Sequence, residues 1–244
     1  MVIDYNKLDG KMGHIGFSML LFGRYDGLNS QGLRITTSRG GVYSAPILNK
    51  KAISNTLAVR ALLENCKNVK EALEKLEKMP VTHTQNYLIS DKSGHIALVE
   101  GIDCIYGVRE LTLESEQQYL CSTNHPTLPK ITPYYKYLHP WLKTNSPMRY
   151  NLIKDTIQQN TPKITPEKIK SLLSVEMLKG LCAYYHGGYF GTIWSMVFDL
   201  TQGKIDICFG PPSHNKWHSF SVSQPDTGNR YSAIIVDKGI MDIS

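Results

Sequence analysis

One asparagine stands where it could assist amide chemistry. In the stretch YLCSTNHP, residues 119–126, a predicted strand ends at Thr123-Asn124, and Pro126 keeps His125 out of helical geometry. An asparagine amide at a strand end can donate an N–H to a carbonyl oxygen that gains negative charge during nucleophilic attack. The same side chain can equally cap a turn. On this stretch alone both interpretations stay open.

Two cysteine–histidine pairs share one spacing, Cys121 with His125 and Cys182 with His186. Together they could make a Cys₂His₂ zinc site, and each pair alone could make a thiol nucleophile with its base. On a strand, however, positions i and i+4 lie about 13 Å apart, which keeps the first pair from sharing a metal or a proton. Both cysteines are therefore predicted to be small buried apolar residues, and we expect neither a metal nor a cofactor.

A glycine-flanked stretch, GRYDGLNSQGLRI at residues 23–35, carries Asp26 and Asn29. Glycine permits positive φ, and Asp and Asn side chains bond readily to nearby backbone, so a turn between two strands explains the pattern. A phosphate-binding loop is not supported, because the segments on both sides are predicted strands. Arg149, in SPMRYNLI, stands at the start of a predicted helix, where a solvated or capping arginine is the simplest interpretation.

Antiparallel sheets and grouped helices must position these residues. Asn68 is predicted to cap a helix, with Glu71 completing a capping box and Pro80 ending the helix. The predicted strands are 15–22, 33–37, NYLISD, HIALVEGI, CIYGVREL, QQYLCSTN, GTIWSMVFDL and KIDICFG, and the predicted helices are 55–65, 69–79, 148–158 and 166–173. This order lacks the regular alternation of a parallel sheet, so the sequence predicts an α+β layered fold in one domain over 1–244.

The composition excludes several classes of protein. The chain has 244 residues, is 41% hydrophobic and 20% charged, and carries a formal net charge of +6, so it can fill a core and is not predicted to be disordered. No run of five like charges marks a nucleic-acid surface, and no apolar stretch is long enough to span a bilayer. The N-terminal residues lack the pattern of a signal peptide. Five scattered cysteines favour a reducing compartment, and we expect a cytoplasmic protein.

The motifs together resemble a known superfamily. They occur in the order GRYDGLNSQGL, LLENCKNVKEALEKLEKMP, NYLISDKSGHIALVEG, STNHP, SPMRYNLI and GTIWSMVFDLTQGKIDICFGPP, over about residues 13–212. This order resembles the superfamily of the choloylglycine hydrolases, which include bile salt hydrolase and penicillin V acylase, and of the isopenicillin N acyltransferase-like cysteine peptidases. The resemblance implies an N-terminal-nucleophile hydrolase fold, an αββα sandwich of two antiparallel sheets with outer helices.

The resemblance also implies an activity and a set of site residues. A cysteine thiolate attacks a linear amide of a small acylated amine or amino acid, and water or an amine then takes the acyl group from the acyl-enzyme. Asn124 matches the side-chain donor to the oxyanion, and Arg149 matches an arginine of the polar network around the nucleophile. Asp26 and Asn29 fall in the glycine-flanked segment beside the cleft, where we expect them to bind substrate. The expected partner is a small acyl amide, with neither nucleic acid nor membrane.

The nucleophile departs from the superfamily pattern. There the catalytic cysteine is the first residue after processing, its α-amino group is the base, and it precedes the DGLN segment by several dozen residues. Here DGLN begins at residue 26, and no cysteine precedes Cys66, which lies in a predicted helix. We therefore expect the N-terminal hairpin to be missing, as in a truncated product, a subunit whose partner chain carries the cysteine, or a non-catalytic relative. Uncovered strand edges then predict association, either as a homo-oligomer or with that partner.

Overall fold

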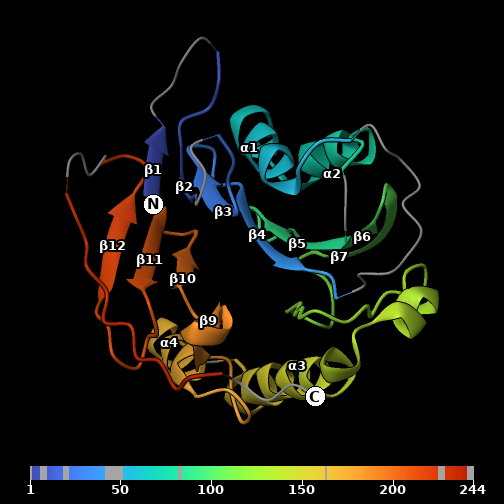
Figure 1. Ribbon diagram of the computed structural model, residues 1–244. Helices are drawn as coiled ribbons and strands as arrows, with labels where there is room; N and C mark the ends of the chain where they lie inside the picture. Colours follow the sequence, from blue (N-terminus) through green and yellow to red (C-terminus); the bar gives the residue numbers. More distant parts are fainter. Residues whose placement is uncertain are drawn as a thin grey trace.

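The computed structural model describes residues 2–5, 10–18, 22–41, 52–81, 84–162, 164–224 and 229–240, the first of these ranges as backbone only. Two antiparallel sheets and four α-helices make up the layers of the fold (Figure 1). Among these residues, no helix combines the length and the apolar character needed to cross a bilayer.

The larger sheet has seven strands that stand in chain order, so each strand pairs antiparallel with the next. The short loop between β5 and β6 contains Gly94 at φ +82°, a conformation that glycine adopts without strain. The strands are β1 (Val2–Tyr5), β2 (His14–Phe17), β3 (Asp26–Asn29), β4 (Arg34–Arg39), β5 (Thr84–Ser90), β6 (Ile96–Ile102) and β7 (Ile105–Leu111).

The predicted turn at DGLN is wrong, because these residues form strand β3. Gly16 of β2 and Gly27 of β3 are register partners, and a Cβ on Gly27 would lie 2.6 Å from Leu63 Cδ1 and 2.7 Å from the Ile15 carbonyl oxygen. The glycine therefore permits close packing of strand and helix rather than a positive φ. The turn itself follows β3, where Gly32 has φ +89°.

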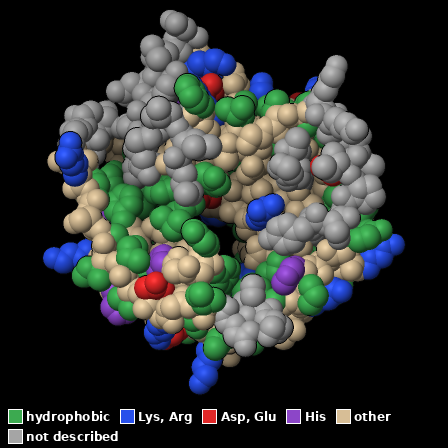
Figure 2. All heavy atoms as spheres, in the orientation of Figure 1, with side chains coloured by type: hydrophobic (Ala, Val, Ile, Leu, Met, Phe, Trp, Pro, Cys, Tyr) green, Lys and Arg blue, Asp and Glu red, His purple; other side chains and the backbone are tan. Residues whose placement is uncertain are grey.

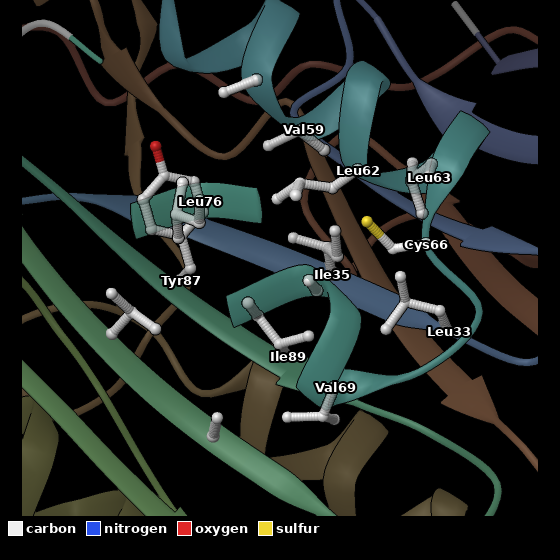
Figure 3. Packing of buried hydrophobic residues seen from close by; sticks show 14 of the residues in the cluster. Leu33, Ile35, Val59, Leu62, Leu63, Cys66, Val69, Leu76, Tyr87 and Ile89 are labelled. Atoms are coloured by element: carbon white, nitrogen blue, oxygen red, sulfur yellow. The ribbon is translucent and has the colours of Figure 1, made fainter. Parts of the chain in front are cut away.

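Helices α1 (Asn55–Asn65) and α2 (Val69–Glu77) cover one face of the larger sheet (Figure 1), and both were predicted. Asn68 caps α2 by accepting the Glu71 N–H at 2.9 Å, while the Glu71 carboxylate accepts the Lys67 N–H instead of the Asn68 N–H. In Figure 3 the apolar side chains of both helices point toward those of the strands beneath them. This cluster includes Leu33, Ile35, Val59, Leu62, Leu63, Cys66, Val69, Leu76, Tyr87 and Ile89.

The smaller sheet packs its inner face against the larger one. Its strands are β10 (Trp194–Asp199), β11 (Lys204–Phe209) and β12 (Trp217–Ser221), in that order. Ile15 and Leu28 of the larger sheet are buried in one cluster with Ile205, Ile207 and Phe220 of the smaller one. Two further strands, β8 (Tyr184–Tyr185) and β9 (Phe190–Gly191), pair with each other.

Helix α4 (Pro166–Ser174) lies against the outer face of the smaller sheet. Lys170 of α4 contacts Asp206 of β11 at 2.5 Å and lies over the ring of Trp217. Thr165 caps α4 as predicted, by accepting the Lys168 N–H. The order of layers is the predicted αββα sandwich.

Helix α3 (Pro140–Asn160) begins eight residues before its predicted start at 148. Pro147 lies inside it, and because proline has no N–H, the Lys143 carbonyl loses its helical partner. The hydroxyl of Tyr135, from the 3₁₀ helix η1 (Thr132–Tyr137), donates to that carbonyl at 3.2 Å. The helix thus continues through Pro147, which directly precedes the predicted start.

The predicted strand QQYLCSTN is also wrong, because residues 117–124 pair with no strand. The Thr123 carbonyl instead accepts hydrogen bonds from the side chains of Ser38 and Asn86. Those two residues are cross-strand partners in β4 and β5, so their side chains project from one face of the sheet. The segment crosses that face, where its backbone cannot join the ladder.

Candidate functional site

A cleft of about 680 Å³ separates the larger sheet from strand β10 and helix α4. Its size is within the range of small-molecule sites, about 300–1,000 Å³. Figure 2 shows a hollow near the centre of the face that it draws. The cleft is lined by Asp26, Arg34, Thr36, Thr37, Arg149, Ile169, Leu173, Leu181, Gly191, Thr192, Ile193, Trp194, Ser195, Met196, Val197 and Phe198.

Two predicted site residues, Arg149 and Asn124, are in direct contact. Arg149 Nη2 donates to Asn124 Oδ1 at 2.6 Å, and its Nε donates to Asn145 Oδ1 at 2.7 Å. Arg149 lines the cleft, whereas Asn124 lies one hydrogen bond away from it. Burial lowers the pKa of Arg149 to about 10, which still leaves the guanidinium charged near neutral pH.

The amide of Asn124 is held at both ends. A guanidinium can only donate, so the oxygen of the amide faces Arg149 and the nitrogen faces the other way. Asn124 Nδ2 donates to the Arg39 carbonyl oxygen at 2.7 Å, and its second N–H has no partner among the residues that the structure describes. One amide hydrogen is therefore free for a ligand.

Ser146 fixes the backbone that carries Asn124. Its Oγ accepts the N–H groups of Asn124 at 2.8 Å and His125 at 2.9 Å. The same oxygen contacts Thr123 Oγ1 at 2.9 Å and His125 Nδ1 at 2.8 Å. Burial, and then the positive charge of Arg149, lower the pKa of His125. Ser146 is fully buried, so this Ser–His contact is structural and cannot reach a substrate.

Asp26 lines the cleft, and its contact with a substrate stays a prediction. One carboxylate oxygen accepts the Thr37 N–H at 2.8 Å, and the other accepts Trp194 Nε1–H at 3.1 Å. Burial raises the pKa of Asp26 to about 6, against the opposing effect of these two hydrogen bonds and of the Arg34 charge. The carboxyl group therefore titrates near neutral pH and ties β3 to β10 across the cleft.

Arg34 is a second cation of the cleft. Its guanidinium carbon lies 5.1 Å from the centre of the Phe198 ring, within the distance of a cation–π contact. Its Nε is buried and has no hydrogen-bond partner in the described part of the chain. Burial also lowers the pKa of Arg34, partly offset by the charge of Asp26. A buried, unsatisfied donor on a cation is a favourable place for an anionic or carbonyl oxygen.

Asn29, the other predicted substrate-binding residue, lies outside this cleft and is 2% exposed. Its Nδ2 donates to the carbonyl oxygens of Leu63 and Cys66 at the end of α1. Its Oδ1 accepts the N–H groups of Gln31 and Leu33. These bonds use both donors and both acceptor positions of the amide, so Asn29 holds the end of α1 against the turn after β3. Its contact with substrate stays a prediction.

None of the five cysteines lines the cleft. All five are free thiols, and burial raises the pKa of Cys66 and of Cys208 to about 11 and raises that of Cys121. A thiol nucleophile needs the opposite shift. Within the described ranges, no three His, Cys, Asp or Glu side chains gather into a metal site.

Sequence reasoning missed Arg34, Ser146 and Trp194. Asp26 and Trp194 are 168 residues apart, and no spacing rule joins such positions. Arg34 follows a turn with no motif around it, and Ser146 lies just before the predicted start of the helix at 148. Signals came from the Asp-Gly motif, the TNHP motif and the SPMR stretch.

Comparison with known proteins identifies the family of the chain. The sequence model of the acyl-coenzyme A:6-aminopenicillanic acid acyl-transferase family matches residues 3–214. No curated protein matches the sequence.

Three solved structures share the fold at low sequence identity. Penicillin V acylase from Agrobacterium tumefaciens is 20% identical, with 86% of this chain and 72% of that chain covered and a TM-score of 0.54. A mutant of conjugated bile acid hydrolase from Clostridium perfringens is 16% identical, with 97% and 86% covered and a TM-score of 0.59. The Caenorhabditis elegans orthologue of N-acylethanolamine-hydrolyzing acid amidase is 12% identical, with 87% and 80% covered and a TM-score of 0.52. The likeness confirms the predicted N-terminal-nucleophile hydrolase fold.

Proposed function

The chain belongs to the acyl-coenzyme A:6-aminopenicillanic acid acyl-transferase family, and on that premise we propose that it acts on linear amide C–N bonds as a cysteine-type hydrolase or acyltransferase. The proposed substrates are small acylated amines or amino acids. A cleft with apolar walls from α4 and polar groups from β3 and β4 suits such a molecule, which has an acyl chain and an amide. The five free thiols favour a reducing compartment, and we propose the cytoplasm.

The observation that carries this proposal is the contact between Arg149 and Asn124. It orients the amide so that a free N–H remains, next to an arginine that lines the cleft. An oxyanion needs such a fixed donor, because a donor that must reorganise during the reaction stabilises the transition state less. We assign Asn124 to the oxyanion and Arg149 to the positioning of Asn124.

The proposed reaction has two steps. A general base takes the proton of the thiol, the thiolate adds to the amide carbonyl carbon, and the displaced electron pair makes an oxyanion that Asn124 stabilises. The carbonyl then reforms, the C–N bond breaks, and the amine departs with a proton from the general base. The acyl group remains on the cysteine as a thioester. Water or a second amine then attacks the thioester, releases an acid or a new amide, and restores the thiol.

The source of the thiol separates two candidate functions. No cysteine of these residues lines the cleft, so for the enzyme we place the nucleophile outside them, either on a preceding segment of the same protein or on a partner polypeptide. The second candidate is a non-catalytic relative that keeps the cleft for binding alone. The raised thiol pKa values favour it over a chain that is catalytic by itself.

One assay distinguishes the candidates. The tagged chain is isolated from its own cells under mild conditions, so that any partner is retained, and incubated with chromogenic amides of short, long and aryl acids. Release of the amine, together with an acyl mass on a cysteine in intact-protein mass spectrometry, supports the enzyme. If neither amine nor acyl adduct forms with any amide, the enzyme is excluded and the binding function remains.

A further inference from the structure

The charged side chains that line the cleft are Asp26, Arg34 and Arg149. Arg149 uses Nε and Nη2 for two asparagine side chains, and both carboxylate oxygens of Asp26 accept N–H groups of the protein. Arg34 differs, because its Nε has no hydrogen-bond partner in the described part of the chain, and its Nη2 donates to Thr36 Oγ1 at the long distance of 3.4 Å. With Asp26 ionised, the cleft carries one more positive than negative charge, which a single monoanion would balance.

The guanidinium of Arg34 is held so that one edge stays available. Its carbon lies 5.1 Å from the centre of the Phe198 ring, so the ring covers one flat face. The N–H groups of Nε and Nη2 share an edge and form a fork that matches the two oxygens of a carboxylate. Ser90, the cross-strand partner of Arg34, is 4% exposed, and its Oγ also lacks a partner within the described residues. Two adjacent buried polar atoms without partners indicate a position for a ligand or a water.

Arg34 and the proposed oxyanion donor lie at different points along strand β4. Nη2 of Arg34 lies beside Thr36, whereas the Asn124 amide lies at the carbonyl of Arg39. Three residues of a strand span about 10 Å. After a hydrogen bond of about 3 Å at each end, at least about 4 Å remains between the amide oxygen and the carboxylate of one ligand. An N-acylated amino acid meets this separation.

The walls of the cleft decide which part of such a ligand carries the carboxylate. Helix α4 and the segment after it contribute Ile169, Leu173 and Leu181, which are apolar. The wall from β3 and β4 contributes Arg34 and three further polar side chains. An apolar acyl chain suits the α4 wall, so the carboxylate belongs to the amine part of the ligand, on the side of Arg34.

We propose that Arg34 selects the substrate by binding the carboxylate of an N-acylated amino acid through Nε and Nη2, while the amide oxygen lies at Asn124. This role rests on the proposed function, because it takes the reaction at Asn124 as given. It narrows the substrates from acylated amines and amino acids to acylated amino acids. Arg34 moves no proton and breaks no bond in this scheme, so its effect is on binding.

Direct binding tests this role without any need for turnover. The probes are ketone analogues of N-acetyl-, N-octanoyl- and N-phenylacetylglycine, in which a CH₂ group replaces the amide N–H, so that no reaction consumes them. Each is made with the free carboxylate and with a carboxamide in its place, and is titrated calorimetrically against the tagged chain isolated from its own cells. We expect the best carboxylate to bind about ten-fold or more tightly than its carboxamide. Equal binding overturns the role of Arg34 but leaves the proposed function, whereas no binding of any probe contradicts both.

A substitution of Arg34 assigns the preference to this residue. Arg34→Gln should weaken the carboxylate probe by about ten-fold and leave the carboxamide unchanged, so that the two probes bind alike. Arg109→Gln is the matched control, because it changes an exposed arginine of β7 that donates to Gln117, and it should keep the full preference. An equal loss for both probes in Arg34→Gln would show that Arg34 supports the fold of the cleft and does not select the ligand.

Two further measurements complete the test. A probe with its carboxylate at the far end of the acyl chain should bind no better than the carboxamide, and tight binding of that probe would overturn the assignment of the carboxylate to the amine part. If Arg34→Gln does not fold by circular dichroism, the unaltered chain gives the answer. The best carboxylate probe should protect Arg34 from phenylglyoxal, as read by peptide mass spectrometry, while the carboxamide should not. Equal labelling of Arg34 with both probes overturns the proposal.

Discussion

Arg149 of α3 donates through Nη2 to Oδ1 of Asn124, 25 residues earlier in the chain, at 2.6 Å. The bond joins a residue that lines the cleft to one that does not. It also decides which end of the Asn124 amide carries the free N–H. The most direct tests of the proposed function therefore concern these two residues.

Asn124→Ala removes the proposed oxyanion donor. In a preparation that turns over an amide, we expect kcat to fall by about 10²–10³, with KM changed little because the donor acts mainly in the transition state. Steady-state kinetics on a chromogenic amide measures both constants. Asn160→Ala, at the far end of α3, is the control and leaves both unchanged. An equal kcat for Asn124→Ala and the parent removes Asn124 from the mechanism.

Arg149→Gln tests whether Arg149 acts through Asn124. The single variant is expected to lose about 10²-fold in kcat, because a misplaced donor fits the oxyanion poorly. Combined with Asn124→Ala, it should add almost nothing, since residues that act as a unit are not additive. The four kcat values of this double-mutant cycle give the answer. Fully additive losses would assign Arg149 a separate contact with the substrate.

Ser146→Ala tests the support beneath Asn124. The change leaves the partly buried N–H groups of Asn124 and His125 without their acceptor, and each such loss costs about 1–3 kcal/mol. We expect the free energy of unfolding to drop by roughly 2–4 kcal/mol, as measured by urea denaturation. Ser174→Ala, which removes only a bond to the Lys170 carbonyl in α4, should cost less than half as much. Similar costs for both variants would contradict the assignment.

Asp26 makes the stability fall as the pH rises. Its pKa is raised from 3.8 to about 6 in the folded protein by burial, so between these values the folded state binds more protons than the unfolded state. The contribution is complete below pH 3.8 and is lost as the pH passes 6. At about 1.4 kcal/mol per pKa unit, it amounts to roughly 3 kcal/mol. The difference in unfolding free energy between the parent and Asp26→Asn should change by this amount between pH 4 and 7. A constant difference would contradict the shift.

His14 has the opposite effect in the same sheet. Burial, and then the charge of Arg24, lower its pKa from 6.5 to about 4, so between these values the unfolded state binds more protons. The contribution is complete above pH 6.5 and is lost as the pH falls toward 4, again by roughly 3 kcal/mol. Urea unfolding of the parent and of His14→Gln across this window measures it. If the stability of the parent relative to His14→Gln increased as the pH falls, the assignment would be refuted.

Local rules predicted the parts of this fold that local chemistry determines. Asn68 caps α2 because its side chain reaches the N–H of Glu71 three residues later, and the β5–β6 hairpin follows from a short glycine loop. The prediction of a strand at 117–124 was wrong because Ser38 and Asn86, both distant in sequence, bind its backbone from a sheet face. The resemblance to a family supplied Asn124 and Arg149. Arg34 and Trp194 could not be found, because only the packing of two sheets brings them to one cleft.

The chain-order arrangement of the larger sheet has a consequence for synthesis in the cell. All seven strands have been translated by residue 111, but Ile15 and Leu28 are covered by Ile205 and Ile207, which follow about 180 residues after the first strands. At about 5–20 residues per second, the ribosome needs on the order of ten seconds or more to supply that cover. During this interval the nascent sheet shows a bare apolar face to its surroundings, which is the kind of surface that chaperones bind.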